Sequence, residues 1–301
     1  MSRRPHRSRR LRRWNSPLGL ACCLFVAVPA AAEPAETAEP QPDKSGYSLF
    51  DPVPDSRMRD FAPDRPAKTT GPTTVDAGHV QYELDFASYN FQSSDGIHSR
   101  SWVAPNPTIK IGLTNSLDLQ LNMAPYTGVS VSDSRTRTSS TVEGVGDLVV
   151  RAKWNLGGNE GGKTAFAIIP FIKVPTAPNG IGNGATEGGA LASLQVSLPK
   201  GLSLVLNSEV DALKDSLPDG HHTRYVNAAA LTVPVVKDVS FTTEIWSSVD
   251  RDPAGTVVQA SIDAAFAWTV RPNLQLDVGA NFGLNAATPR FELYGGLAQR
   301  F

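Results

Sequence analysis

Charged and polar side chains recur at every second position over most of this 301-residue chain, and they are its main chemical signal. From residue 79 onward they alternate with apolar residues in runs of about ten. Alternate side chains of a strand point to opposite faces, so each run has one face in a polar medium and one in an apolar medium. We predict that the polar set lines an aqueous lumen and selects a solute by replacing part of its hydration. The alternative is that these charges pair across the lumen and block it. The set comprises Glu83, Asp85, Lys110, Asp118, Asp147, Arg151, Lys153, Lys173, Glu209, Asp211, Glu244, Asp263, Asp277, Arg290 and Glu292.

Patterns that would support catalysis or a metal site are weak. Adjacent histidines such as His221-His222 rarely aim at one ion, and no third ligand is evident. The glycine-rich stretch 180–184 lies between two expected strands and precedes no helix, which argues against a phosphate cradle. No nucleophile stands beside a base in the pattern that covalent catalysis requires. We therefore predict no enzyme activity, no catalytic residue, no cofactor and no metal site.

The alternating runs predict the elements that position these side chains. Runs such as Val258–Trp268 indicate strands, and counting through the chain gives about twelve of them. No amphipathic helical run separates the strands, so βαβ architectures are excluded. Short turns, such as 271–273, alternate with longer polar connections, which is the plan of an outer-membrane barrel. The longer connections are expected at 92–101, 127–143, 175–187, 213–222 and 248–255.

A soluble β-sandwich would also alternate, and the aromatic residues help to distinguish the two folds. Tyr126 lies near one end of the predicted strands, and Trp154, Trp268 and Phe301 lie near the other, as the interfacial girdles of a membrane barrel require. Phe301 also ends an alternating strand, where it would serve as the assembly signal for the barrel-assembly machinery. We predict an all-β fold, an antiparallel transmembrane β-barrel of residues 79–301.

The N-terminal residues have a different composition. Residues 1–32 contain seven arginines and no acid, followed by an apolar run that ends in Ala30-Ala31-Ala32. This order predicts a signal peptide that is cleaved after export to the bacterial outer membrane. Both cysteines, Cys22 and Cys23, lie within it, so a disulfide scaffold is excluded. The overall net charge of −1 leaves no basic excess for binding nucleic acid.

Two segments separate the predicted signal peptide from the barrel. Residues 33–46 are rich in Pro, Ala and Glu, which predicts a flexible linker. Residues 47–78 contain five prolines, which exclude a regular helix or a central strand, but also several apolar anchors. We predict an extended pre-barrel segment in which Asp64 and Arg65 plug the lumen or close the periplasmic mouth. The alternative is an ordered periplasmic strap.

Four motifs resemble a known family of outer-membrane transporters, named for the meta-cleavage pathway of phenol degradation. Residues 61–66 (FAPDRP) and 75–83 (VDAGHVQYE) resemble its pre-barrel signature. Residues 144–154 (GVGDLVVRAKW) resemble its Gly-Asp-Leu strand, and 296–301 (GLAQRF) its closing strand. The resemblance covers roughly residues 47–301 and implies a barrel that imports aromatic compounds.

Together these features predict an outer-membrane channel that passes small solutes, with aromatic or hydrophobic compounds as candidates, through a narrow charged lumen. Outer-membrane lipid would be its surroundings and the barrel-assembly machinery its folding partner. Two alternatives remain: a structural or adhesive barrel without a conducting pore, and an outer-membrane hydrolase.

Overall fold

Strands make up nearly all of the regular structure. The computed structural model describes residues 43–217 and 220–301, so the predicted signal peptide and most of the predicted linker lie outside the described residues. The strands are β1 (Val80–Ser94), β2 (Ile97–Val103), β3 (Asn106–Thr114), β4 (Leu117–Asn122), β5 (Thr127–Asp133), β6 (Thr138–Gly144), β7 (Leu148–Gly157), β8 (Thr164–Val174), β9 (Glu187–Ser197), β10 (Ser203–Lys214), β11 (His221–Val236), β12 (Val239–Asp252), β13 (Gly255–Arg271), β14 (Leu274–Gly283) and β15 (Phe291–Arg300).

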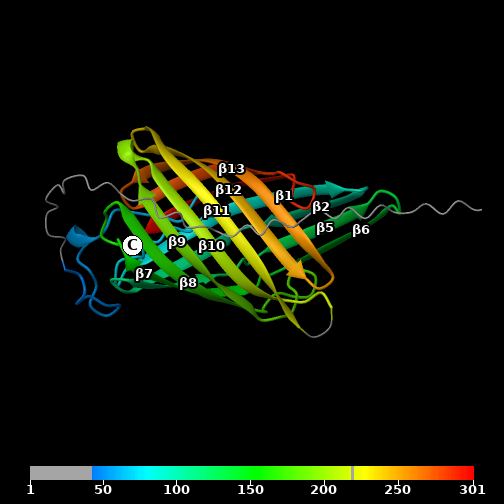
Figure 1. Ribbon diagram of the computed structural model, residues 1–301, viewed down its shortest axis with the longest axis horizontal. Coiled ribbons are helices and arrows are strands. Elements are labelled where there is room, and N and C mark those ends of the chain that lie inside the picture. The colour runs from blue at the N-terminus through cyan, green and yellow to red at the C-terminus, as the bar shows by residue number, and fades with distance from the viewer. Residues whose placement is uncertain (1–42, 218–219) are drawn as a thin grey trace, which may run out of the picture. The chain divides into compact units, whose positions relative to one another are not determined.

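Three of the barrel strands are interrupted, so these segments fill 12 positions around a closed barrel. β1 pairs with β3 along its first half and with β2 along its second half, because β2 and β3 are two parts of one strand. β4 and β5 are related in the same way, as are β6 and β7. All pairings are antiparallel, and β15 pairs with β1 to close the sheet. The predicted number of strands is confirmed. Figure 1 shows the strands wrapping around the barrel.

The two rims of the barrel differ in their connections. The inner rim, which carries the chain end at Phe301, has short turns, among them residues 272–273 between β13 and β14. At the outer rim, three connections that we expected to be loops are strand hairpins instead. The tight turn Asp95-Gly96, with φ of 48° and 79°, joins β1 directly to β2, as positive φ at both central residues allows. The polar residues of these three hairpins are exposed to water, but they continue the strands and do not form loops. The connection at 175–186 is a loop, as predicted, and the described residues 215–217 and 220 of the connection between β10 and β11 also lie outside the strands.

The strand faces separate as the alternation requires. Large apolar side chains such as Ile262, Phe266 and Val278 are exposed on the outside of the barrel, which is the face that lipid covers. Trp154 and Trp268 are about half exposed close to the inner rim, where an aromatic girdle is expected. The side chains that point inward are mostly polar or small. No helix among the described residues is long and apolar enough to span a membrane.

The pre-barrel segment docks at the inner rim and then enters the barrel. Its first part contains the short 3-10 helix η1 (Asp55–Arg57) and bonds to the wall through Leu49 N and Leu113 O, 2.9 Å apart. In Figure 1 this part lies at the end of the barrel that carries the C-terminus. Contacts begin at Lys44, which is 3% exposed, so the structured region starts before the predicted boundary at residue 47. Lys44 forms ion pairs with two carboxylates, which a composition-based linker prediction could not detect.

Candidate functional site

Residues 61–76, hereafter the lumen segment, lie against the inside of the barrel wall. Asp64 is central to this contact. Its carboxylate accepts hydrogen bonds from Lys153 Nζ, at 2.9 and 3.0 Å, and from Lys110 Nζ, which also binds Glu83. Burial opposes ionisation of Asp64, but the two lysine ammonium groups outweigh it and lower the pKa to about 2. Asp64 is therefore a fixed negative charge between two nearly inaccessible lysines.

Arg65 reaches the strands beside the point where the barrel closes. Its guanidinium donates to both carboxylate oxygens of Asp277 on β14, at 2.9 and 2.5 Å, and also to Asp85 on β1. A Cβ at position 296 would lie 2.6 Å from Arg65 Nη2, so Gly296 leaves the space that the guanidinium occupies. The two parallel hydrogen bonds from Arg65 to the carboxylate of Asp277 form the bidentate arrangement that makes arginine–carboxylate pairs strong and directional.

The backbone of the lumen segment is held by side chains of the wall. Glu244 accepts hydrogen bonds from the amides of Lys68 and Thr69, at 3.3 and 2.7 Å. Asn207 accepts from the Thr70 amide at 2.7 Å, and Asp118 accepts from the Val75 amide at 3.0 Å. An extended segment without a strand partner must satisfy its amides in another way, and the inward carboxylates and amides of the wall provide the acceptors.

A second cluster ties the start of the lumen segment to the inner rim. Arg59 Nε donates to Glu160 in the β7–β8 turn at 2.8 Å, and Lys44 pairs with the same carboxylate at 2.7 Å. Burial opposes ionisation of Glu160, but its bonds with the two cations lower its pKa below the ordinary value. Arg300 Nη1 donates to the Arg59 carbonyl at 2.8 Å. We did not predict this cluster, because its members share no strand periodicity.

Eight of the fifteen predicted lumen charges contact the lumen segment. The contacts described above account for six of them. Glu83, which accepts from the Asp64 amide at 3.1 Å, and Glu292, 3.4 Å from Lys68, are the other two. The other seven have different surroundings. Lys173 bridges Asp147 and Glu187 at 3.0 and 2.9 Å, and Asp211 accepts from Arg224 at 2.8 Å. The remaining positions are Asp263, which accepts from Tyr294 at 2.7 Å, Arg151 over the ring of Phe171, Glu209 beside Asp211, and Arg290, which is exposed.

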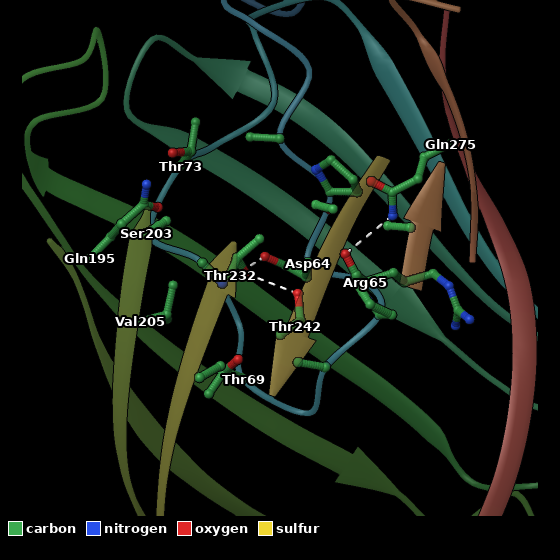
Figure 2. A pocket seen from close by; sticks show the side chains of 18 of the residues that line it. Asp64, Arg65, Thr69, Thr73, Gln195, Ser203, Val205, Thr232, Thr242 and Gln275 are labelled. Carbon is green, nitrogen blue, oxygen red and sulfur yellow. Dashed lines mark hydrogen bonds between the residues drawn. The ribbon is translucent and has the colours of Figure 1, made fainter. Parts of the chain in front are cut away.

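Two cavities border the lumen segment. The outer cavity, of about 220 Å³, is bounded by charged side chains such as Asp85, Arg151 and Glu292. The inner cavity, of about 320 Å³, is bounded by wall residues from the half of β9–β14 nearest the inner rim. Figure 2 shows residues that line this inner cavity, among them Asp64 and Arg65 of the lumen segment and Ser203, Thr232 and Thr242 of the wall.

Two of the histidines lie at opposite rims of the barrel. Among the described residues, no group of three or more His, Cys, Asp or Glu side chains is placed to hold a metal ion. His79 at the inner rim contacts the carbonyl oxygens of Val53 and Phe301, at 2.7 and 3.0 Å. His222 at the outer rim lies between Asp215 and Asp250, at 3.0 and 2.8 Å.

The structure is similar to that of the COG4313 outer membrane channel from Pseudomonas putida F1. The TM-score is 0.54 at 14% sequence identity, and the match covers 74% of this chain and 94% of that chain. At this identity the likeness shows the fold alone. The translocator domain of the autotransporter NalP from Neisseria meningitidis (TM-score 0.44, 10% identity, 79% of this chain and 90% of that chain) is more distant. The beta domain of the Bordetella autotransporter BrkA is also more distant (TM-score 0.47, 11% identity, 74% of this chain and 99% of that chain).

Sequence comparison defines the family. No curated protein sequence matches this chain. The family model described as "Putative MetA-pathway of phenol degradation" matches residues 63–301, which include the last part of the pre-barrel segment and the whole barrel. The resemblance that the motifs indicated is confirmed, and the chain belongs to this family.

Proposed function

We propose that this protein is an outer-membrane channel for small solutes and that the lumen segment closes it. The observation that carries the proposal is a pair of cavities inside one closed barrel, with residues 64–67 and Thr69 of the lumen segment contributing to the boundary of both. A solute that crosses from one cavity to the other passes this segment. Displacement or rearrangement of the segment joins the two cavities into a single path.

The charges of the lumen hold the closed state in this proposal. Asp64 and Arg65 each bind wall residues that are distant in sequence, so a displaced segment would leave several buried charges without partners. Such charges are costly unless water or a solute replaces the lost contacts. We expect the closed state to dominate and openings to be rare.

Conductance in planar bilayers tests this function. Residues 62–72 are replaced by an equal length of Gly and Ser, which removes the anchors and keeps the chain length. A matched control replaces the outer loop, residues 176–186, in the same way. We expect a several-fold larger single-channel conductance from the first variant only, with both variants still migrating as heat-modifiable barrels. Equal conductance in the wild type and both variants contradicts a closing role, and the absence of any conductance steps supports the structural or adhesive alternative.

Localisation and assembly form a second part of the proposal. We infer export through the N-terminal signal, residence in outer-membrane lipid and insertion by the barrel-assembly machinery. In support, Phe301 completes the β15–β1 seam through bonds between its backbone and that of Val80, at 2.8 and 3.4 Å, while its side chain is 65% exposed. Phe301→Ala keeps these backbone bonds. We expect it to lower the amount of assembled barrel in cells without changing the stability of protein refolded in detergent.

A further inference from the structure

One aromatic residue of the pre-barrel segment is more exposed than any other large apolar side chain that the structure describes. Phe50 is 93% exposed, and its neighbour Leu49 is 38% exposed. The next most exposed member of this class, Phe301, is 65% exposed. Single apolar residues are common on protein surfaces, so exposure alone assigns no role to Phe50. The way in which its turn is attached to the barrel is more informative.

Phe50 lies at the tip of a turn that is fixed at both ends. The Ser48 amide donates to Asp51 O at 2.9 Å, and the Asp51 amide donates back to Ser48 O at 3.1 Å, so Phe50 is one of the two central residues of a tight turn. The chain is bonded again shortly afterwards, because the Val53 amide donates to Ala77 O at 3.0 Å and Val53 is buried. The exposure of Phe50 is therefore part of the fold and does not come from an unattached stretch of chain.

The turn joins the barrel wall at the level of the aromatic girdle. Ser48 forms a β-bridge with Thr114 at the end of β3. Thr114 pairs with Leu117 on β4, and Leu117 pairs with Trp154 on β7. Neighbouring strands lie about 4.8 Å apart, so the attachment point is about 10 Å from Trp154 along the same row of paired residues. The turn is thus continuous with the part of the wall that lipid covers.

We propose that the turn at residues 48–51 is a membrane anchor, which places the Phe50 ring in the lipid interface of the inner leaflet beside the girdle. Phe and Leu side chains bind at the boundary between headgroups and acyl chains because burial there removes apolar surface from water. Ser48 and the exposed Asp51 flank the two apolar residues and keep polar groups at the level of the headgroups. An apolar tip on a polar base is the arrangement that an interfacial position requires.

The anchor would fix the place from which the chain enters the barrel. Residues 51–60 separate Phe50 from the lumen segment, and Arg59 among them bonds to Glu160 in the β7–β8 turn. With Phe50 in lipid and Arg59 on the wall, the inner end of the pre-barrel segment stays in place while the lumen segment rearranges. The inference goes beyond the proposed channel function and does not depend on it, since a non-conducting barrel could make the same contact with lipid.

Site-directed fluorescence quenching in lipid nanodiscs tests the anchor. In a full chain with Cys22→Ser and Cys23→Ser, a bimane label attaches only to the cysteine introduced by Phe50→Cys. The matched control is Ser56→Cys, at an exposed position of η1 in the same segment, and Val278→Cys labels the lipid-covered outside of the barrel. The quenchers are iodide in the water and a phosphatidylcholine that carries a nitroxide near the top of its acyl chain. Heat-modifiable migration on a gel verifies that each variant is a folded barrel.

We expect the nitroxide lipid to quench the label at position 50 about 5-fold more strongly than at position 56, and iodide to show the opposite order. Because the label is the same, its own affinity for lipid is common to all three positions. Equal quenching by iodide at positions 50 and 56 overturns the proposal, since the side chain at position 50 is then in water. Protection of position 50 from both quenchers also overturns it, and indicates that a second copy or another protein covers the turn.

Discussion

Two parts of the same barrel wall, built with the same alternation, carry different side chains on their inner faces. The wall formed by β1, β3, β4 and β7 lies against the lumen segment and buries Lys110, Asp118 and Lys153, each at most 2% exposed. The facing wall, near the inner rim of β9 to β14, presents Ser, Thr, Gln, Ala and Val to a cavity. The charges are concentrated where they have a partner in the segment.

This difference changes how the lumen charges should be understood. We expected a mixed ring of charges that selects a solute through hydration. More than half of that set instead engages residues of the lumen segment, and the barrel wall beside the larger of the two cavities carries no charged side chain. We therefore propose that the charges mainly anchor the segment and that the neutral wall is the part that meets the solute. The following predictions test this division, from the largest expected effect to the smallest.

Arg65→Ala should have the largest effect, because it leaves Asp85 and Asp277 facing each other without their shared cation. Removing one partner of a buried ion pair typically costs about 3–5 kcal/mol. We expect a loss of this size in the free energy of unfolding, measured by urea titration in detergent, together with a higher open probability in bilayers. Arg271→Ala, which removes an exposed arginine at the inner rim, is the matched control and should change neither quantity. Similar results for the two variants would contradict an anchoring role.

Acid should weaken the Asp64 anchor next. The pKa of Asp64 is lowered from 3.8 to about 2, so the carboxylate stabilises the folded state above pH 3.8 and loses that contribution as the pH falls through about 2. The amount at stake is on the order of 2 kcal/mol. We expect the stability difference between wild type and Asp64→Asn to be constant from pH 7 to pH 5 and to shrink below pH 4. A difference that already shrinks between pH 7 and pH 5 would show that another group controls the anchor.

The wall of β9 to β14 allows a local test with a smaller effect. Glu244→Gln keeps one oxygen and loses the charge that holds the amides of Lys68 and Thr69. A hydrogen bond to a charged group contributes about 1.5–3 kcal/mol and a neutral one about 1, so the loss should be about 1 kcal/mol. Hydrogen exchange at the Thr69 amide should accelerate about 5-fold or more. The Thr70 amide, which Asn207 holds at 2.7 Å, is the internal control and should keep its rate.

The sequence was sufficient for the architecture because alternation is a local signal. Whether Phe266 or Asp277 points outward or into the lumen depends only on its odd or even position along the strand. The inward and outward faces of the barrel, its closure and its number of strands could therefore be predicted. It could not predict that Asp64 and Lys153 meet, because 89 residues separate them and their contact depends on how an irregular segment folds back. Arg59 and Glu160 were missed for the same reason. The uncharged wall beside the inner cavity could not be predicted either, because the absence of charge gives no motif.

Arg290→Ala should have the smallest effect. The position of Arg290 also shows that alternation along a strand does not predict side-chain direction beyond the strand's end. Arg290 has the parity of an inward residue, but it lies just before β15, is exposed, and is positioned through its backbone amide, which bonds to Phe91 O at 2.8 Å. Alanine keeps that bond. An exposed substitution of this kind usually changes stability by less than about 0.5 kcal/mol. We expect unchanged urea unfolding and unchanged open probability, in contrast to Arg65→Ala. If Arg290→Ala instead opened the channel, charges at the outer rim would also control it, and the assignment of the closing role to the lumen segment alone would fail.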